Sequence, residues 1–421
     1  MDELRLRSGG RVLVVAMVLG WAGGAVAQQG GAVTTGPNAF VGLMRAARAQ
    51  GLAHGAAEFP VLSPWDATVL GEDGKGWNGK DGNGLVPVAR LQAEGFKVVP
   101  WTTNDPAKMR ALLALGVDGI ISDRPDVLQR VLVEERAAAR GDAGRLAYLA
   151  RVDVTAHRGG RGLRPENTLP SFESGLDQLS TTLETDTGVT TDHVSLIWHD
   201  QFLNPKSCRR VDGAAYTLEN RVYVRDISVA EAQKTFVCDK LHYGAEFGSG
   251  GFPEQRNDLN LSPVAVAFAK QEGLMSPYVP TYVEQLFRFT AFYADYYRTG
   301  PGRTHPEAAA RAANAAKVRF NIETKILPYA NDPAGASVAG LPVPQADAEP
   351  ETNHTVGPQA FVDALCGAIK RSGMEARVEV QSFDFRTLQL VEAQYPRIPT
   401  YYLTETVESL KSALLPASLR Q

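Results

Sequence analysis

The stretch at residues 154–200, VTAHRGGRGLRPENTLPSFESGLDQLSTTLETDTGVTTDHVSLIWHD, places polar side chains at the ends of short strand-like runs. The first run, VDVTA, delivers His157 into glycines, and a later one, VSLIW, delivers His199. In TLETDTGV, Glu184 and Asp186 share one face, because residues i and i+2 of a strand point the same way. Neighbouring carboxylates repel unless a cation lies between them, and two imidazoles suit proton transfer in both directions. This pattern predicts a reaction centre at the ends of parallel strands.

The motifs HRG, PENT, Glu-x-Asp and HD, in this order and spacing, resemble the N-terminal half of a glycerophosphodiester phosphodiesterase. Further along, FNIETK (320–325) resembles the next signature strand of that family, and VQSFDF (380–385) resembles the one after. Dispersed motifs in a fixed order are far more specific than one short pattern. The resemblance implies an α/β fold, a TIM-like (β/α)8 barrel of the phosphodiesterase type. A barrel with accidental polar strand ends is the alternative.

Length and charge limit the kind of protein. The chain has 421 residues, enough for one large or two small domains. Its formal net charge is -4 and its pI is about 6.0, and no basic stripe is visible. These properties argue against a nucleic-acid partner and leave a small-molecule substrate as the expectation.

Residues 1–27 have the pattern of a secretory signal peptide. Arg5, Arg7 and Arg11 are followed by the apolar run VLVVAMVLGWAGGAVA, which ends in a small-x-small cleavage site. The run is short for a membrane span, and a retained anchor is the alternative. No other stretch is apolar enough to cross a bilayer. We therefore expect a periplasmic or secreted protein whose residues 28–37 form a linker.

Three cysteines fit an exported protein. Cys208 and Cys238 flank a polar insertion, and a disulfide between them would be worth roughly 3–4 kcal/mol if the geometry permits. Cys366 has helical spacing with Phe361 and Leu365, which favours a buried core residue over a nucleophile.

The order of the resembling segments indicates a circular permutation. Residues 38–135 contain KVVPWTTND and GVDGIISDRPDVL, which resemble the last part of a phosphodiesterase barrel although they come first here. Residues 151–421 contain the usual N-terminal and middle strands, and residues 136–150 would connect the two parts. Barrel termini lie close together, so such a rearrangement is feasible. We predict one barrel domain, 38–421; a tandem array with a truncated first copy is the alternative.

Two long loops interrupt the predicted barrel, at residues 203–262 and 326–358. Insertions on the catalytic face of βα-barrels shape the substrate pocket. The second loop is rich in Pro, Ala and acidic residues, a composition that suits either a lid or a solvated loop.

The predicted metal site consists of carboxylates. Glu184 and Asp186 are hard oxygen ligands, suited to Ca²⁺ or Mg²⁺ rather than zinc. Glu323 lies on the FNIETK strand, and Lys325 shares its face. In the resembled family, the Glu of this strand completes the metal site and the Lys contacts phosphate. A strand-end salt bridge between Glu323 and Lys325 is the alternative.

The resemblance also implies the remaining roles. His157 and His199 would be the acid and the base, and Arg158 would clamp phosphate oxygens with its planar guanidinium. The alternative for Arg158 is an ion pair with Glu184 or Asp186 at the mouth of the barrel.

Four further residues would contact the metal or the substrate: Glu166, Asn167, Trp101 and Gln381. Asn167 could instead order the loop before a helix capped by Thr168, and Trp101 could be a core residue. The turn that carries Thr191, Asp192 and His193 is expected to be structural. Four other histidines are expected at the surface: His54, His242, His305 and His354.

The sequence therefore predicts metal-dependent hydrolysis of glycerophosphodiesters to sn-glycerol 3-phosphate and an alcohol such as choline or ethanolamine. One histidine would deprotonate water or, through a cyclic phosphate, the glycerol 2-hydroxyl, and the other would protonate the departing alcohol. The alternatives are a related phospholipase acting on a lipid phosphodiester and an exported non-catalytic barrel protein. The oligomeric state stays open.

Overall fold

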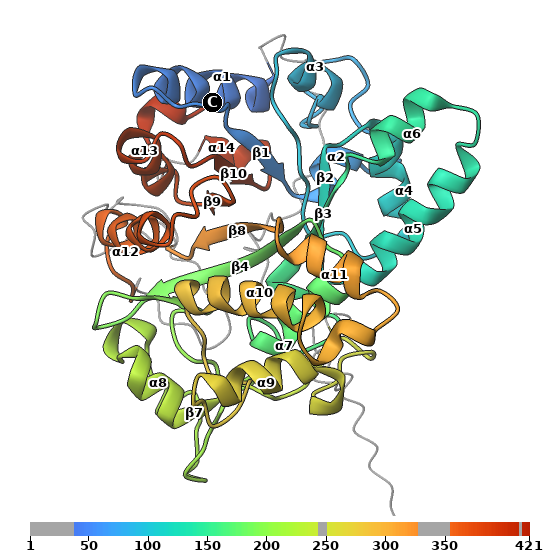
Figure 1. The fold of residues 1–421 in the computed structure, drawn as a ribbon. Helices are drawn as coiled ribbons and strands as arrows, with labels where there is room; N and C mark the ends of the chain where they lie inside the picture. The colour runs from blue at the N-terminus through green and yellow to red at the C-terminus, as the bar shows by residue number, and fades with distance from the viewer. Residues whose placement is uncertain (1–37, 243–250, 327–353, 412–414) are drawn as a thin grey trace, which may run out of the picture.

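The computed structural model describes residues 38–242, 251–326, 354–411 and 415–421. The predicted signal peptide (1–27) and linker (28–37) lie outside the described residues. Seven parallel strands form one curled sheet in the order β1-β10-β9-β8-β4-β3-β2 (Figure 1). Their bounds are β1 (Val61–Pro64), β2 (Gly119–Ser122), β3 (Asp153–Ala156), β4 (Thr182–Val189), β8 (Arg319–Thr324), β9 (Val378–Ser382) and β10 (Thr400–Thr404).

Helices surround this sheet, as expected for a βα-barrel (Figure 1). They are α1 (Ala39–Ala53), α2 (Asp66–Leu70), α3 (Val88–Ala93), α4 (Pro106–Leu115), α5 (Pro125–Ala138), α6 (Ala143–Leu149), α7 (Leu169–Asp177), α8 (Val229–Thr235), α9 (Pro263–Gln271), α10 (Val283–Arg298), α11 (Ala308–Ala315), α12 (Pro358–Arg371), α13 (Phe385–Gln394) and α14 (Val407–Leu410). Several begin with a side-chain cap; the Asn38 side chain, for example, accepts hydrogen bonds from two backbone amides of α1.

The segment 97–103 closes the sheet between β1 and β2. On the β1 side, Val99 N donates to Leu62 O at 2.9 Å. On the β2 side, Ile121 N donates to Pro100 O at 3.0 Å. The sequence predicts a full strand here, but the pairing consists of isolated bridges, because Pro100 has no N–H to donate to a ladder. The result is a closed (β/α)8-type barrel.

Strands that lie far apart in the sequence pair with each other in this barrel. β1 runs parallel to β10, with Val61 opposite Tyr401. β2 runs parallel to β3, with Gly119 opposite Asp153. The N-terminal block 38–135 thus pairs on both sides with strands of the 151–421 part.

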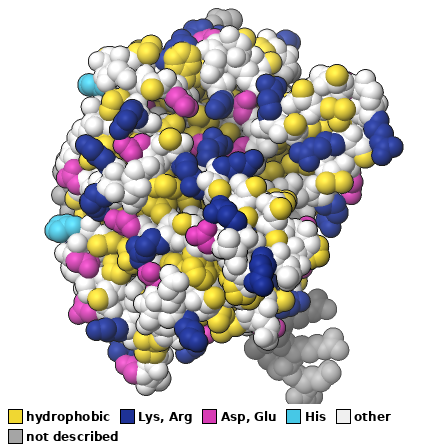
Figure 2. All heavy atoms as spheres, in the orientation of Figure 1, with side chains coloured by type: hydrophobic (Ala, Val, Ile, Leu, Met, Phe, Trp, Pro, Cys, Tyr) yellow, Lys and Arg dark blue, Asp and Glu magenta, His cyan; other side chains and the backbone are white. Residues whose placement is uncertain are grey.

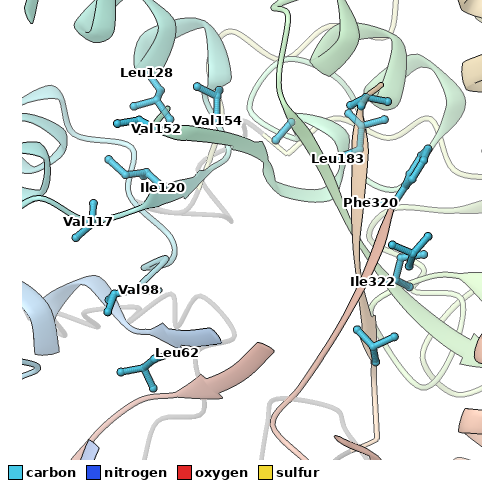
Figure 3. Packing of buried hydrophobic residues seen from close by; sticks show 14 of the residues in the cluster. Leu62, Val98, Val117, Ile120, Leu128, Val152, Val154, Leu183, Phe320 and Ile322 are labelled. Carbon is cyan, nitrogen blue, oxygen red and sulfur yellow. The ribbon is translucent and has the colours of Figure 1, made fainter. Parts of the chain in front are cut away.

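Alternation along the strands separates the barrel interior from the helix-facing layer. Leu62, Val98, Ile120, Leu183 and Phe320 point outward into the core shared with the helices (Figure 3). Their neighbours in sequence point inward, because side chains of a strand alternate between its two faces. The inward residues Val61, Val99, Ile121 and Tyr401 pack together, with Trp101 against them.

The interior is also charged near the start of the strands. Arg319 NH1 lies 2.7 Å from Glu379 Oε1, and Arg319 NH2 lies 3.1 Å from Asp153 Oδ2. Glu379 and Asp153 are buried, so the arginine neutralises carboxylates that would otherwise be costly to bury.

The first insertion has a small core of its own. After β4 the chain turns into β5 (Ser195–Ile197), which pairs antiparallel with β4. The insertion then forms a two-stranded sheet, β6 (Arg209–Arg210) and β7 (Phe236–Val237). A disulfide joins Cys208 and Cys238 across 30 residues of sequence, beside Trp198 and Phe236. Cys366 is buried as a free thiol in α12.

Within the described residues, no helix combines the length and the apolar character that a membrane span requires. On the face shown in Figure 2, basic and acidic side chains are interspersed with apolar and neutral ones.

Candidate active site

Three carboxylates converge at the carboxyl end of the barrel strands. Glu184 and Asp186 lie on β4 and Glu323 on β8, where Asp186 is the register partner of Glu323. One oxygen from each carboxylate lies within 4.8 Å of the others, and all three side chains are buried. The inward face of neighbouring parallel strands thus brings together the residues that the sequence predicts as one metal site.

Neighbouring side chains fix the orientation of two of these carboxylates. Glu184 Oε2 accepts the backbone N–H of Arg158 at 2.7 Å, and Glu184 Oε1 accepts Gln381 Nε2 at 2.8 Å. Asp186 Oδ2 accepts Asn167 Nδ2 at 2.9 Å. Arg158 and Asn167 have φ angles of 50° and 57°, left-handed conformations that place these donors against the carboxylates.

The electrostatics of this cluster favour a bound cation. Burial, and next the negative charge of Asp186, raise the pKa of Glu184 well above its usual range. Burial raises the pKa of Glu323 to about 7, although Lys325 opposes this shift. A divalent cation would offset the repulsion, and buried carboxylate oxygens are the ligands that Ca²⁺ and Mg²⁺ prefer. The acidic cluster therefore fits a metal ion.

His157 stands beside the carboxylates at the end of β3. Its Nε2 lies 3.7 Å from Glu184 Oε2, and its Nδ1 lies 2.6 Å from Asp123 Oδ1. Burial, and next the positive charge of Arg161, lower the pKa of His157 to about 4. The imidazole is therefore neutral near pH 7. Because the Asp123 carboxylate can only accept, Nδ1 carries the proton and Nε2 is free to accept one.

His199 follows β5 and has its own carboxylate partner. Its Nδ1 lies 2.7 Å from Asp200 Oδ1, and Asn204 Nδ2 donates to Asp200 Oδ2 at 2.7 Å. Burial, and next the positive charge of Arg158, lower the pKa of His199. Both predicted catalytic histidines are thus hydrogen-bonded through Nδ1 to an aspartate, with His199 buried and His157 partly buried.

Two arginines border the cluster. Arg158 NH1 lies 3.1 Å from both oxygens of Glu166, and Arg158 Nε lies 3.3 Å from Asp186 Oδ2. Arg161 Nε lies 2.6 Å from Asp123 Oδ1. Burial would raise the pKa of Glu166, but the charges of Arg158 and Arg161 hold it at about 2. The ion pair with Asp186, which the sequence offered as the alternative role of Arg158, is therefore present in the structure. Arg158 nevertheless lies at the site.

The other predicted residues also lie at this end. Lys325 Nζ lies 3.1 Å from Glu323 Oε1, the ion pair considered from the sequence, and 5.7 Å from the centre of the Phe383 ring. The Trp101 ring packs edge-to-face on Phe383 with centroids 5.4 Å apart, and it also borders the interior core. Asn167 Oδ1 accepts from Thr185 at 2.8 Å, so this residue orders its loop as well as facing Asp186.

Sequence reasoning missed the partners of the histidines and Arg161. Asp123 is two residues beyond the inward Ile121 on β2, so strand alternation alone could have placed it in the interior. In the sequence, Asp200 stands out only as part of the HD motif. Nothing in the sequence singles out Arg161, because its contacts depend on the loop after β3.

Two histidines expected at the surface are instead partly buried near the site. His242 Nε2 lies 3.0 Å from Ser207 Oγ, in the disulfide-linked insertion. His354 Nε2 lies 2.8 Å from Asp226 Oδ2, and His354 lines a small pocket with Lys325 and Asp200. The insertion and the end of the second loop fold onto the barrel mouth, which loop composition could not show. His54 and His305 are exposed, as expected.

Comparison with known proteins places the chain in a family. The sequence model of the Glycerophosphoryl diester phosphodiesterase family matches residues 71–127 and 157–295. These segments contain the HRG, PENT, Glu-x-Asp and HD motifs of the site. Among curated proteins, none matches significantly.

Solved structures resemble the chain over part of its length. A phosphodiesterase from Oleispira antarctica, in complex with the product sn-glycerol-3-phosphate, has 16% identity and a TM-score of 0.31, over 59% of this chain and 64% of that one. A glycerophosphodiester phosphodiesterase from Parabacteroides distasonis has 14% identity and a TM-score of 0.29, over 59% and 63%. One from Agrobacterium tumefaciens has 13% identity and a TM-score of 0.30, over 58% and 64%. The chain thus spans less than two thirds of these structures, and the assignment rests on the sequence match. The chain belongs to the glycerophosphoryl diester phosphodiesterase family.

Proposed function

We propose that the protein hydrolyses glycerophosphodiesters to sn-glycerol 3-phosphate and an alcohol. The observation that carries this proposal is the convergence of Glu184, Asp186 and Glu323 within 4.8 Å of one another, with His157 Nε2 3.7 Å from Glu184. A phosphodiester is anionic, so its hydrolysis needs charge neutralisation together with a proton acceptor and a proton donor. This cluster offers all three.

The two histidines divide the proton transfers. His157 is neutral near pH 7 because burial lowers its pKa to about 4, and its Nε2 is free. Such a group can take a proton from water or from the glycerol 2-hydroxyl. His199 would protonate the departing alcohol oxygen in its imidazolium form, which the hydrogen bond from Nδ1 to Asp200 and the negative charge of a bound phosphodiester favour. These roles of the two histidines suit direct attack by water. They equally suit attack by the glycerol 2-hydroxyl, which forms a cyclic phosphate.

Positive charge at the site would bind the phosphate. Burial would lower the pKa of Arg158, but the charges of Glu166 and Asp186 raise it, so the guanidinium stays protonated. Its planar donors match phosphate oxygens, and Lys325 adds a point charge beside Glu323. Ca²⁺ or Mg²⁺ held by Glu184, Asp186 and Glu323 would supply further neutralisation of the phosphate charge.

The decisive experiment is hydrolysis of glycerophosphocholine by the purified protein, with and without EDTA, followed by addition of Ca²⁺ or Mg²⁺. We expect release of sn-glycerol 3-phosphate, its loss with EDTA and its recovery with one of the two ions. Undiminished turnover in EDTA would refute metal dependence, and no turnover with either ion would refute the activity.

A second candidate, a phospholipase acting on a lipid phosphodiester, is favoured by one observation. Four apolar side chains within the segment 259–275 are exposed by 38–54%: Leu259, Leu261, Val266 and Met275. Exposed apolar side chains of this kind can contact a lipid surface. Rates on glycerophosphocholine and on phosphatidylcholine vesicles, measured side by side, distinguish the two candidates.

We also propose that the barrel is a circular permutation and that the protein is exported. The order of the motifs supports the permutation, and so do the pairings of β1 with β10 and of β2 with β3. Gln421 packs directly against Gly42 of α1, so the segment after β10 lies beside the helix that precedes β1. The disulfide between Cys208 and Cys238 supports export, because such bonds persist in oxidising compartments.

A further inference from the structure

Glu405 is an acidic residue at the catalytic end of the barrel to which the mechanism above gives no role. It follows β10, on which Tyr401 points inward and packs with Val61. Residues at i+2 and i+4 of a strand share a face, so the backbone of β10 places Glu405 on the inward register. It therefore lies at the same end of the barrel as Glu323 and His157.

The Glu405 carboxyl is buried, and one of its oxygens has no hydrogen-bond partner in the described structure. The residue is 7% exposed, and the oxygen in question is Oε1. Burial raises the pKa of Glu405 to about 7, although the charge of Lys325 opposes the shift. The carboxylate with which Lys325 forms its ion pair is that of Glu323. A buried carboxyl without a partner is destabilising, so a group that binds there restores a favourable interaction.

Two aromatic rings lie at the same end of the barrel, and the centre of one of them, Phe383, is 5.7 Å from Nζ of Lys325, the residue whose charge acts on Glu405. Phe383 follows β9, whose Ser382 is the register partner of Tyr402 on the strand that leads to Glu405. The Trp101 and Phe383 rings meet at 87° with centroids 5.4 Å apart, and both are partly exposed. Rings at such an angle present a face and an edge to the same space, and aromatic faces attract cations.

We propose, on the basis of the function proposed above, that Glu405, Trp101 and Phe383 bind a cationic ammonium head group of the substrate. The Glu405 carboxylate supplies the opposite charge and a free acceptor oxygen, and the rings supply cation–π contacts. A neutral polyol head group can donate hydroxyl hydrogen bonds to this carboxylate, but it brings no charge to neutralise it and makes no cation–π contact with the rings. The subsite lies next to Lys325, so a substrate whose phosphate contacts Lys325 extends its alcohol portion toward Glu405.

The test begins with the unmodified protein. Hydrolysis of glycerophosphocholine and glycerophosphoethanolamine is compared with that of glycerophosphoglycerol, whose head group is neutral. Inhibition by choline is compared with inhibition by its neutral isostere 3,3-dimethylbutan-1-ol. We expect kcat/KM to be about tenfold higher for the two cationic substrates and choline to inhibit at about tenfold lower concentration, as a desolvated cation–π and charge contact implies. Equal values for the cationic and neutral compounds would overturn the inference.

The matched variants are Glu405→Gln, which removes the charge and keeps the shape, and Glu408→Gln, an exposed residue of α14. For E405Q we expect KM for glycerophosphocholine to rise about tenfold while kcat and the glycerophosphoglycerol parameters stay within about twofold. E408Q should resemble the unmodified protein. An equal loss on all three substrates would overturn the cationic subsite and leave the phosphodiesterase proposal intact. Absence of turnover of every substrate by the unmodified protein would instead refute the proposed function itself.

Discussion

The Nδ1 atom of His157 lies 2.6 Å from Oδ1 of Asp123, although these residues follow two different strands, β3 and β2. Burial would raise the pKa of Asp123, but the charges of Arg161 and His157 lower it, so Asp123 is ionised at neutral pH. An acceptor at Nδ1 fixes the tautomer of the imidazole. The N-terminal block 38–135 therefore supplies a group that orients a predicted catalytic residue of the other part.

Asp123→Asn tests this relationship. The amide cannot replace the charge, and it permits the tautomer whose Nε2 carries the proton. We expect kcat to fall about 10- to 100-fold, on the usual strength of a charge-assisted hydrogen bond, with KM for glycerophosphocholine nearly unchanged. Asp105→Asn, in the exposed cap of α4, is the control. A rise in KM at constant kcat would mean that Asp123 contributes to binding instead.

The proposed acid–base roles of His157 and His199 predict that replacing either histidine lowers kcat. His157→Ala and His199→Ala should each lower kcat by about 10²-fold or more, the usual contribution of general acid–base catalysis. Circular dichroism and the thermal midpoint should change little, because both side chains line the site at the strand ends. His305→Ala, at an exposed position, should keep full activity. Near-normal turnover by either of the first two variants would exclude the two-histidine mechanism.

The disulfide between Cys208 and Cys238 predicts that these two cysteines are oxidised while Cys366 is a free thiol. Mass spectrometry of protein from an oxidising compartment should find Cys208 linked to Cys238 and Cys366 free. Burial raises the pKa of the Cys366 thiol, which should therefore resist alkylation until the protein unfolds. A Cys208→Ser/Cys238→Ser double variant should lose about 3–4 kcal/mol of stability, by the loop-entropy estimate. Free thiols at both positions would exclude the bond and weaken the case for export.

The permutation predicts that neither part folds alone. A chain beginning at residue 136 lacks β1, β2 and the closing segment 97–103, so β3 and β10 expose unpaired edges. We expect insoluble or unfolded protein. Moving residues 38–135 behind Gln421 through a short linker should restore a soluble active barrel, and gel filtration with an activity assay measures both. Full activity of the shortened chain would contradict the single-barrel proposal.

Glu392 predicts a pH dependence of stability away from the site. Its Oε1 accepts hydrogen bonds from Thr400 at 2.8 Å and from Tyr402 at 3.0 Å, and burial raises its pKa to about 7. Between its ordinary pKa of 4.5 and about 7, the unfolded chain loses this proton while the folded protein keeps it. The free energy of unfolding therefore falls as pH rises through this window. In Glu392→Gln this component should vanish, as thermal midpoints from pH 4.5 to 8 would show.

Much of the fold follows from local patterns. On β4 and β8 the inward carboxylates alternate with outward residues that include Leu183, Phe320 and Ile322, and this pattern is visible in the sequence. The β-prone composition of the segment around Val98 and Trp101 predicts a regular strand. Pro100 and the tertiary closure between β1 and β2 decide its actual pairing, and sequence periodicity does not contain that information.

The site was predictable to the extent that its residues lie at strand ends. Glu184, Asp186 and Glu323 share an inward register, so strand alternation suffices to bring them together. The partners contributed by loops are different, because Arg161 reaches Asp123 only through the turn after β3. His354 likewise reaches the pocket near Lys325 from the end of a loop whose path no periodicity describes.

The pairing of Val61 with Tyr401 has a consequence for how the protein is made. A ribosome releases β1 long before its neighbour β10, which follows it by more than 300 residues. Until then one edge of β1 has no permanent partner, and exposed edges are sites of mispairing and aggregation. If the chain is exported unfolded, the interval in which β1 lacks its partner strand falls largely on the far side of the membrane. Closure of the barrel then has to wait for β10, because it joins two strands that are made far apart in time.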